Sequence, residues 1–192
     1  MRKLEIGPAA NGQTPDGDQA SSWDTLDSSR DCTYQATWGE SLPIESDTYD
    51  LVHASHVLEH VPWWKVETAL REARRILAPG GRLEIFVPDG IKILREYLAY
   101  PTVYSKREQS WPCAGLNPGK DPWIYLNARL FWGARPGEMG QPQHFHKSLY
   151  GESILNKLLL DNNFADIQII QRTKSGFVGH GWMEIGMQGV KT

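Results

Sequence analysis

Short apolar runs separated by polar turns fill the first part of the chain, which is the pattern of β-strands. Four runs predict strands, at Lys3–Gly7, Thr25–Leu26, Tyr34–Ala36 and Tyr49–Ser55. Residues 8–22 are rich in Gly, Pro, Asn, Gln, Asp and Ser and have no helical period, so we expect a loop there. The next connection, Ser28–Thr33, is shorter still. The first half of the expected sheet is therefore abbreviated.

The period of the apolar residues changes from Trp63 onwards. One stripe at helical spacing consists of Val66, Ala69, Leu70, Ala73, Ile76 and Leu77. These positions fall on one face of a 3.6-residue repeat and predict an amphipathic helix. Pro79-Gly80-Gly81 should end this helix, and Arg82–Val87 should form the next strand, closed by Pro88-Asp89.

The second half predicts two more helices, one from Ile91 to about Tyr100 and one at Glu152–Asn162. Two last strands are expected at Ile167–Ile170 and Met183–Met187. Residues 101–145 are rich in Pro, Gly and aromatic residues without a clear period, so we expect an irregular insert. Aromatic residues in and just before this insert are Tyr97, Tyr100, Tyr104, Trp111, Trp123, Tyr125, Phe131 and Trp132.

Alternation of strands and helices predicts an α/β fold with a doubly wound, mostly parallel sheet. At 192 residues we expect one domain, 1–192, with the 101–145 insert on its substrate side. In such sheets the ligand lies outside the carboxyl ends of the strands. The residues that follow each strand are therefore the candidates for function.

Composition and charge narrow the class of protein. The net charge is −3, which gives no electrostatic argument for nucleic acid or an anionic membrane. No apolar run approaches the ~20 residues of a membrane span, and the start of the chain does not look like a signal peptide. Cys32 and Cys113 match no metal or redox spacing. We therefore expect a cytoplasmic protein with free thiols.

Two of the predicted strands end in residues suited to a nucleotide-like ligand. Gly7 follows the first strand and would let the backbone approach a ligand closely, beside the carboxylate of Glu5. A simple Gly-Pro turn explains the same residues equally well. Asp27 follows the second strand, where an acidic residue can hold ribose hydroxyls, although a lone aspartate in a loop is more often a turn residue.

The combination of four segments is more specific. These are LEIGPA, the acidic residue in WDTLD, ESLPIESDTYDLVHASHVLEHV and EARRILAPGGRLEIFVPD. Together they resemble the S-adenosylmethionine-dependent methyltransferases of the Rossmann-like class, and most of all the small, type 11-like branch associated with glycan and cell-surface biosynthesis. The resemblance covers roughly residues 3–90 and resumes at His146–Ile170.

The resemblance implies methyl transfer from S-adenosylmethionine to a small-molecule or sugar acceptor, at a hydroxyl. The alternative is a catalytically inactive cofactor-binding or interaction module of the same fold. The implied cofactor-binding residues are Glu5, Gly7, Pro8 and Ala9 at the methionine part, Asp27 at the ribose, Trp38, Gly39 and Glu40 around the adenine, and Ser55 and His56 at the methionine end. Ala9 and Asn11 stand where the family usually carries glycines, and Trp38 stands where it usually carries an aspartate. Trp38 could stack on the base or belong to the core.

His56–His60 also reads as H-x-x-E-H, the inverted zinc-protease motif. That motif needs both histidines on one face of a long helix, whereas Pro62 follows closely here. We therefore expect no metal site and no stoichiometric zinc in this protein, and rank a zinc hydrolase third. Glu59 and His60 are expected to fix the loop by hydrogen bonds.

Methylation of a hydroxyl can also need a general base, and histidine suits that role near neutral pH. The candidates are His144 and His146, with a structural role ahead of the helix at 152 as the equal alternative. The aromatic insert would then cover the acceptor, or else form the contact surface of a homodimer or a small satellite core.

Overall fold

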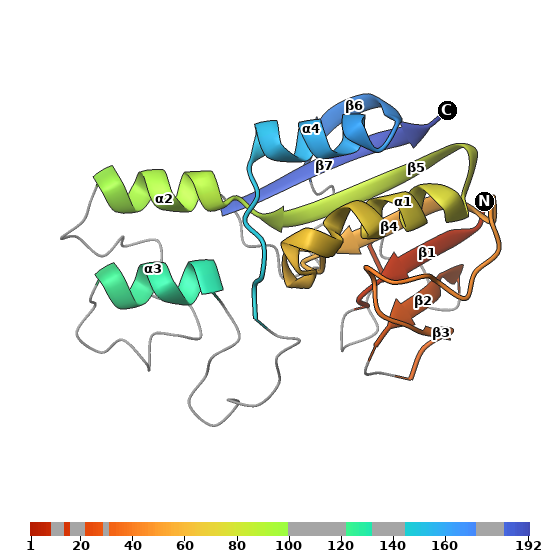
Figure 1. The fold of residues 1–192 in the computed structure, drawn as a ribbon, viewed down its shortest axis with the longest axis horizontal. Helices are drawn as coiled ribbons and strands as arrows, with labels where there is room; N and C mark the ends of the chain where they lie inside the picture. The colour runs from red at the N-terminus through yellow and green to blue at the C-terminus, as the bar shows by residue number, and fades with distance from the viewer. Residues whose placement is uncertain (9–13, 16–21, 29–30, 100–121, 132–144, 172–182) are drawn as a thin grey trace.

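The computed structural model describes residues 1–8, 14–15, 22–28, 31–99, 122–131, 145–171 and 183–192. In these residues the backbone forms a seven-stranded sheet (Figure 1). The strands are β1 Lys3–Ile6, β2 Asp24–Asp27, β3 Tyr34–Gln35, β4 Tyr49–Ser55, β5 Leu77–Pro88, β6 Phe164–Ile170 and β7 Glu184–Lys191. All four strands of the first half stand where the apolar runs predict them.

The sheet has the strand order β3-β2-β1-β4-β5-β7-β6. β3, β2, β1, β4 and β5 run parallel, and β7 is antiparallel to both β5 and β6. The chain proceeds from β1 outwards to β3 and then returns to start β4 on the other side of β1. This reversal creates a topological switch point between β1 and β4, and it confirms the predicted doubly wound, mostly parallel sheet.

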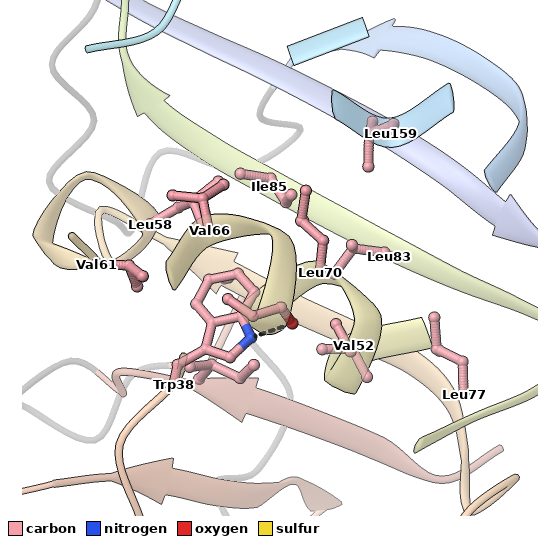
Figure 2. Packing of buried hydrophobic residues seen from close by; sticks show 14 of the residues in the cluster. Trp38, Val52, Leu58, Val61, Val66, Leu70, Leu77, Leu83, Ile85 and Leu159 are labelled. Carbon is pink, nitrogen blue, oxygen red and sulfur yellow. Dashed lines mark hydrogen bonds between the residues drawn. The ribbon is translucent and has the colours of Figure 1, made fainter. Parts of the chain in front are cut away.

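One face of the sheet is covered by α1 (Val66–Ile76) and α4 (Glu152–Asp161), which Figure 1 shows side by side. The predicted stripe of α1 is buried along its whole length. It packs on alternate residues of the strands, among them Val52 of β4 and Leu83 of β5 (Figure 2). A buried leucine contributes about 1.5–3 kcal/mol to stability, so this shared core holds α1 firmly over the sheet.

β5 begins earlier than predicted. The helix ends at Ile76, and the strand already starts at Leu77, before the Pro-Gly-Gly segment. Tyr49 pairs with Leu77 and Leu51 with Arg82, so the residues between Leu77 and Arg82 bulge out of the ladder. Gly80 takes a positive φ of 78° in this bulge. Pro79-Gly80-Gly81, which predicts a turn, therefore forms a β-bulge rather than a loop.

Two further helices, α2 (Gly90–Ala99) and α3 (Pro122–Phe131), lie beyond the carboxyl ends of the strands (Figure 1). They share a small second core made of Ile93, Leu130 and Met183, with Leu94 and Leu126 against it. The helix at 122–131 corrects the expectation that 101–145 is wholly irregular. Pro122 is favourable in the first turn of a helix, and Leu126 and Leu130 are one turn apart, so a short helix gains a partner in α2.

The chain leaves the sheet after β5, before these two helices, and returns next to the same point. The Gly90 N–H donates to the Tyr150 carbonyl at 2.9 Å, and the Asp89 N–H donates to the Met183 carbonyl at 2.6 Å. The Asp89 carboxylate also accepts the Lys92 N–H at 2.9 Å, which caps the start of α2. Among the described helices, none is long and apolar enough to cross a membrane.

Candidate cofactor site

A cavity of about 340 Å³ opens at the carboxyl ends of β1, β2 and β4, at the switch point of the sheet. This volume lies within the ~300–1,000 Å³ range of small-molecule sites. Its wall is formed by Ile6, Gly7, Pro8, Leu26, Asp27, Ser28, Ala36, Thr37, Trp38, His56, Val57, His60, Val61, Pro62, Lys65 and Lys147. Five of the ten predicted cofactor-binding residues are among them, namely Gly7, Pro8, Asp27, Trp38 and His56.

Gly7 meets the requirement for glycine in two ways. Its φ is +69°, and a Cβ added there would stand 2.4 Å from Cγ2 of Val57. Its N–H donates to the Leu26 carbonyl at 2.8 Å, which fixes the turn after β1 against β2. Bare backbone is therefore exposed to the cavity at this point. Glu5, two residues earlier, is buried behind the wall, and Ala9 lies outside the described residues.

Trp38 belongs both to the wall and to the core. Its ring is buried, and its indole N–H donates to the Ala69 carbonyl in α1 at 2.8 Å (Figure 2). Gly39 and Glu40, which follow Trp38 in the chain, are not on the cavity wall. The Glu40 carboxylate instead forms an ion pair with the Lys65 ammonium at 3.0 Å, and Lys65 does reach the wall.

His56 occupies the mouth of β4 in a left-handed conformation with φ +54°. Its Nδ1 lies 3.2 Å from Oε1 of Glu59, and its Nε2 lies 2.7 Å from Oε2 of Glu184. Burial favours the neutral ring, but hydrogen bonds to the two carboxylates outweigh it and raise the pKa of His56 to about 9. His56 is therefore an imidazolium at neutral pH. Ser55, just before it, is buried and not on the wall.

The H-x-x-E-H residues do not share a long helix. The left-handed His56 is followed by a single 3-10 turn, Leu58–His60, as the early proline suggests. Both of its predicted bracing residues hold the loop. The Glu59 carbonyl accepts the N–H groups of Lys147 and Ser148 at 2.7 and 3.2 Å, and Nδ1 of His60 donates to the Phe145 carbonyl at 3.2 Å.

This bracing brings His146 next to the same turn. The rings of His60 and His146 stack edge to face with centroids 5.0 Å apart, and Nε2 of His146 lies 4.0 Å from Oε1 of Glu59. Burial lowers the pKa of His146 to about 4, so its ring is neutral at neutral pH. Burial would raise the pKa of Glu59, but the hydrogen bond with His56 and the neighbouring histidines lower it. His144, the other predicted base, lies outside the described residues.

Three cationic or polar positions on the wall or beside it escape sequence reasoning. Lys65 and Lys147 line the cavity, and Glu184 holds His56. Glu184 reaches the mouth of the sheet because its strand runs antiparallel and begins there, and the sequence does not reveal that direction. The two lysines come from a helix end and a loop, where lysine is ordinary.

Solved structures share this architecture over the full length of the chain. One is an S-adenosylmethionine-dependent methyltransferase, a possible histamine N-methyltransferase, from Thermotoga maritima, with a TM-score of 0.56, 16% identity and coverage of 100% of this chain and 82% of that one. Another, from Aquifex aeolicus, has a TM-score of 0.51, 13% identity and the same coverages. The fold is that of the S-adenosylmethionine-dependent methyltransferases.

Sequence comparison adds a local match to this methyltransferase fold. A family model described as a methyltransferase domain matches residues 16–85. The uncharacterized protein YafE of Escherichia coli is 41% identical over 54 residues, which are 28% of this chain and 25% of YafE. The match thus spans about a quarter of that relative's length. The local sequence match and the fold are thus both those of methyltransferases.

Proposed function

We propose that this protein transfers a methyl group from S-adenosylmethionine to a hydroxyl of a small-molecule or sugar acceptor. The observation that carries the proposal is the cavity at the switch point, with Gly7 and Asp27 on its wall. The turn at Gly7 admits no side chain, so bare backbone is presented to a ligand. A carboxylate on the neighbouring strand end is suited to ribose hydroxyls. These two features fit a nucleoside-containing cofactor.

Each part of the wall has a role in holding this cofactor. Asp27 would accept hydrogen bonds from the ribose hydroxyls, and Trp38 would bound the adenine side. Gly7 and Pro8 would contact the methionine part, where the imidazolium of His56 favours a carboxylate. When bound, the cofactor supplies a methyl group activated by its positively charged sulfur.

The acceptor oxygen loses its proton as the C–O bond forms and the C–S bond breaks. We infer that His146 takes this proton, because its ring is neutral at neutral pH and lies beside His60 on the cavity wall. A weak base is sufficient, since an alcohol oxygen becomes a strong acid once it carries the methyl group. His146 hydrogen-bonds to the backbone of Leu130, so α3 is tied to the same place.

A sugar acceptor is supported by the exposed aromatic residues of α3. Trp123 and Phe131 are 62% and 53% exposed on this helix. Aromatic rings with open faces can stack on the apolar faces of sugars, and α3 lies on the side of the sheet where the strands end (Figure 1). This placement favours the glycan branch of the family over acceptors without an apolar face.

Calorimetric titration tests the proposal directly. The wild-type protein should bind S-adenosylmethionine and S-adenosylhomocysteine, and D27N should weaken both by roughly 10- to 100-fold, because charge-assisted hydrogen bonds are lost. D31N is the matched control, since Asp31 is exposed and not on the wall. Absence of binding at millimolar ligand would refute the proposal. Binding without methyl transfer to any sugar or hydroxylated acceptor would favour the inactive module.

A further inference from the structure

Three side chains beside the cavity form a cluster with the donor atoms of a metal site. Glu59, His60 and His146 each offer a ligand atom, and these atoms lie within 4.8 Å of one another. Glu59 is only 1% exposed, and its Oε2 has no hydrogen-bond partner within the described part of the chain. A buried carboxylate oxygen without a partner is unfavourable, and a bound cation is one way to satisfy it.

The atoms of these side chains that would not bind the ion make hydrogen bonds of the kind found around metal sites. A histidine that binds a metal through one nitrogen usually donates its other N–H to a carbonyl or carboxylate. Nδ1 of His60 donates to the Phe145 carbonyl at 3.2 Å, and His146 hydrogen-bonds to the backbone of Leu130. Oε1 of Glu59 accepts from Nδ1 of His56 at 3.2 Å, which leaves Oε2 for another partner. All three side chains are thus oriented by a second contact.

We propose that Glu59, His60 and His146 bind a divalent transition-metal ion of the zinc class, with a fourth coordination position towards the cofactor cavity. Two histidines and one glutamate with an open position are one of the ligand sets of catalytic zinc sites. Tetrahedral ligands about 2.0–2.1 Å from the ion are roughly 3.3 Å apart, so the side chains must move inwards by about 1 Å. Because His60 is also on the cavity wall, the ion would face the acceptor.

This site differs from the inverted zinc-protease motif of the sequence, which pairs His56 with His60. His56 is held between Glu59 and Glu184 and is not a ligand here. The third ligand is His146, which no local motif connects to the turn at residues 58–60. The proposal departs from the sequence-based expectation that the protein holds no metal, because the tertiary structure supplies a ligand set that the H-x-x-E-H motif does not contain.

The role of the ion rests on the proposed function, whereas its binding does not. A cation at this position would lower the pKa of an acceptor hydroxyl and release its proton to water. The acceptor oxygen would then form the C–O bond while the C–S pair stays on sulfur. In the metal-bound protein His146 would serve as a ligand, so the proton would go to solvent rather than to its ring.

Metal titration of the chelator-treated full chain tests the site. We expect one equivalent of Zn²⁺ or Co²⁺ by elemental analysis, a visible Co²⁺ absorption typical of a tetrahedral site, and a higher melting temperature with either ion. H146Q and H60Q should each weaken Co²⁺ binding by at least about 10-fold. H53Q is the matched control, because His53 lies in β4 and pairs with Glu84 instead. Mg²⁺ should not compete, since it prefers oxygen ligands.

The outcomes separate the site from the proposed function. Wild-type protein that binds less than one equivalent of Zn²⁺ and Co²⁺, or folded H146Q and H60Q that bind both ions as the wild type does, would overturn the site. Circular dichroism establishes that each variant is folded, and the Co²⁺ spectrum of the wild type needs no variant. Cofactor binding without metal binding would leave the proposed function standing and remove this inference. Metal binding without cofactor binding would support the metal site and refute the proposed function.

Discussion

His56 and Glu184 are joined by a contact of 2.7 Å between Nε2 and Oε2, although 128 residues separate them in the sequence. One stands at the end of β4 and the other at the start of β7, with β5 between these strands. The pair therefore links two strands that do not touch in the sheet. It also fixes the charge of a side chain on the cavity wall.

Replacing Glu184 by Gln should lower the pKa of His56 from about 9 towards its ordinary 6.5, because the closest carboxylate is removed. The free energy of unfolding at pH 7 should fall by about 1–3 kcal/mol, as expected for a lost charged hydrogen bond. NMR titration of the ring and urea unfolding measure the two effects. The exposed E45Q serves as control. An unchanged pKa would mean that Glu59 alone holds the proton on His56.

Substitution of two glycines with positive φ should separate strain from steric clash. G80A meets nothing within 4 Å of its new Cβ and should reduce stability only by about 1–2 kcal/mol, the cost of the left-handed conformation. G7A has the same conformational cost and also a contact of 2.4 Å with Val57, so it should lose roughly 1–3 kcal/mol more. In a G7A background, truncation of Val57 to Ala should restore the stability that is lost through the steric contact with Val57. Equal losses for G7A and G80A would contradict the cavity turn described above.

Stability should depend on pH through Glu72 of α1. Its carboxylate accepts two hydrogen bonds from Arg75, at 2.9 and 2.8 Å, and one from the Leu42 N–H at 2.8 Å. The Arg75 guanidinium lowers the pKa of Glu72 below its ordinary 4.5, so this stabilisation is present above about pH 4.5 and is lost as pH falls through the folded-state pKa.

E72Q should therefore lose about 1–2 kcal/mol at pH 7, a value discounted because Arg75 is partly exposed to solvent. The difference from wild type should shrink as the pH is lowered from 4.5 towards 3. Urea unfolding at several pH values measures it. A difference that stays constant across this range would mean that the loop at Leu42 is held by shape rather than by charge.

Trp38 gives a prediction that distinguishes its core role from a contact with the adenine. W38F keeps an aromatic ring but removes the 2.8 Å bond to the Ala69 carbonyl, so it should lower stability by about 1 kcal/mol and leave cofactor affinity nearly unchanged. W63F is the matched control, because Trp63 is 71% exposed. Loss of affinity without loss of stability would assign the indole N–H to the ligand.

The acceptor side can be tested through α3. W123A removes a ring that is exposed on this helix, so it should reduce acceptor use while cofactor affinity by calorimetry stays within about twofold. W64A is the control, since Trp64 is equally exposed but lies on a different turn. Equal activity of W123A and wild type over a panel of sugars would remove α3 from the acceptor site.

Local patterns were sufficient for most of the elements. Tyr49–Ser55 matches β4 at both ends because β-leaning residues there are bounded by polar ones, and the stripe starting at Val66 matches α1 because burial and period agree. The sequence does not predict α3, because its two core leucines, Leu126 and Leu130, form too short an apolar pattern to show a clear period. Its stability comes from α2, which lies far away in sequence.

For the site too, the sequence predicts local features but not the contacts between distant segments. The positions of Gly7 and Asp27 at the cavity can be predicted, because the rule for strand ends needs only the positions of the strands. The contacts of Glu59 with His146 and of His56 with Glu184 join distant segments, so no spacing predicts them. The antiparallel direction of β7 decides the second contact, and direction cannot be read from an apolar run.

The hydrogen bond from Gly90 to Tyr150 has a consequence for how this protein can change over evolution. Because the chain leaves and re-enters the sheet at adjacent points, the stretch between them can lengthen, shorten or be exchanged without shifting a strand. Selection for a new acceptor could therefore replace this segment while the sheet stays the same. His146 lies within the segment, whereas Glu59 and His60 lie outside it. A replacement segment would therefore need its own histidine opposite Glu59 and His60 to keep the proposed metal site.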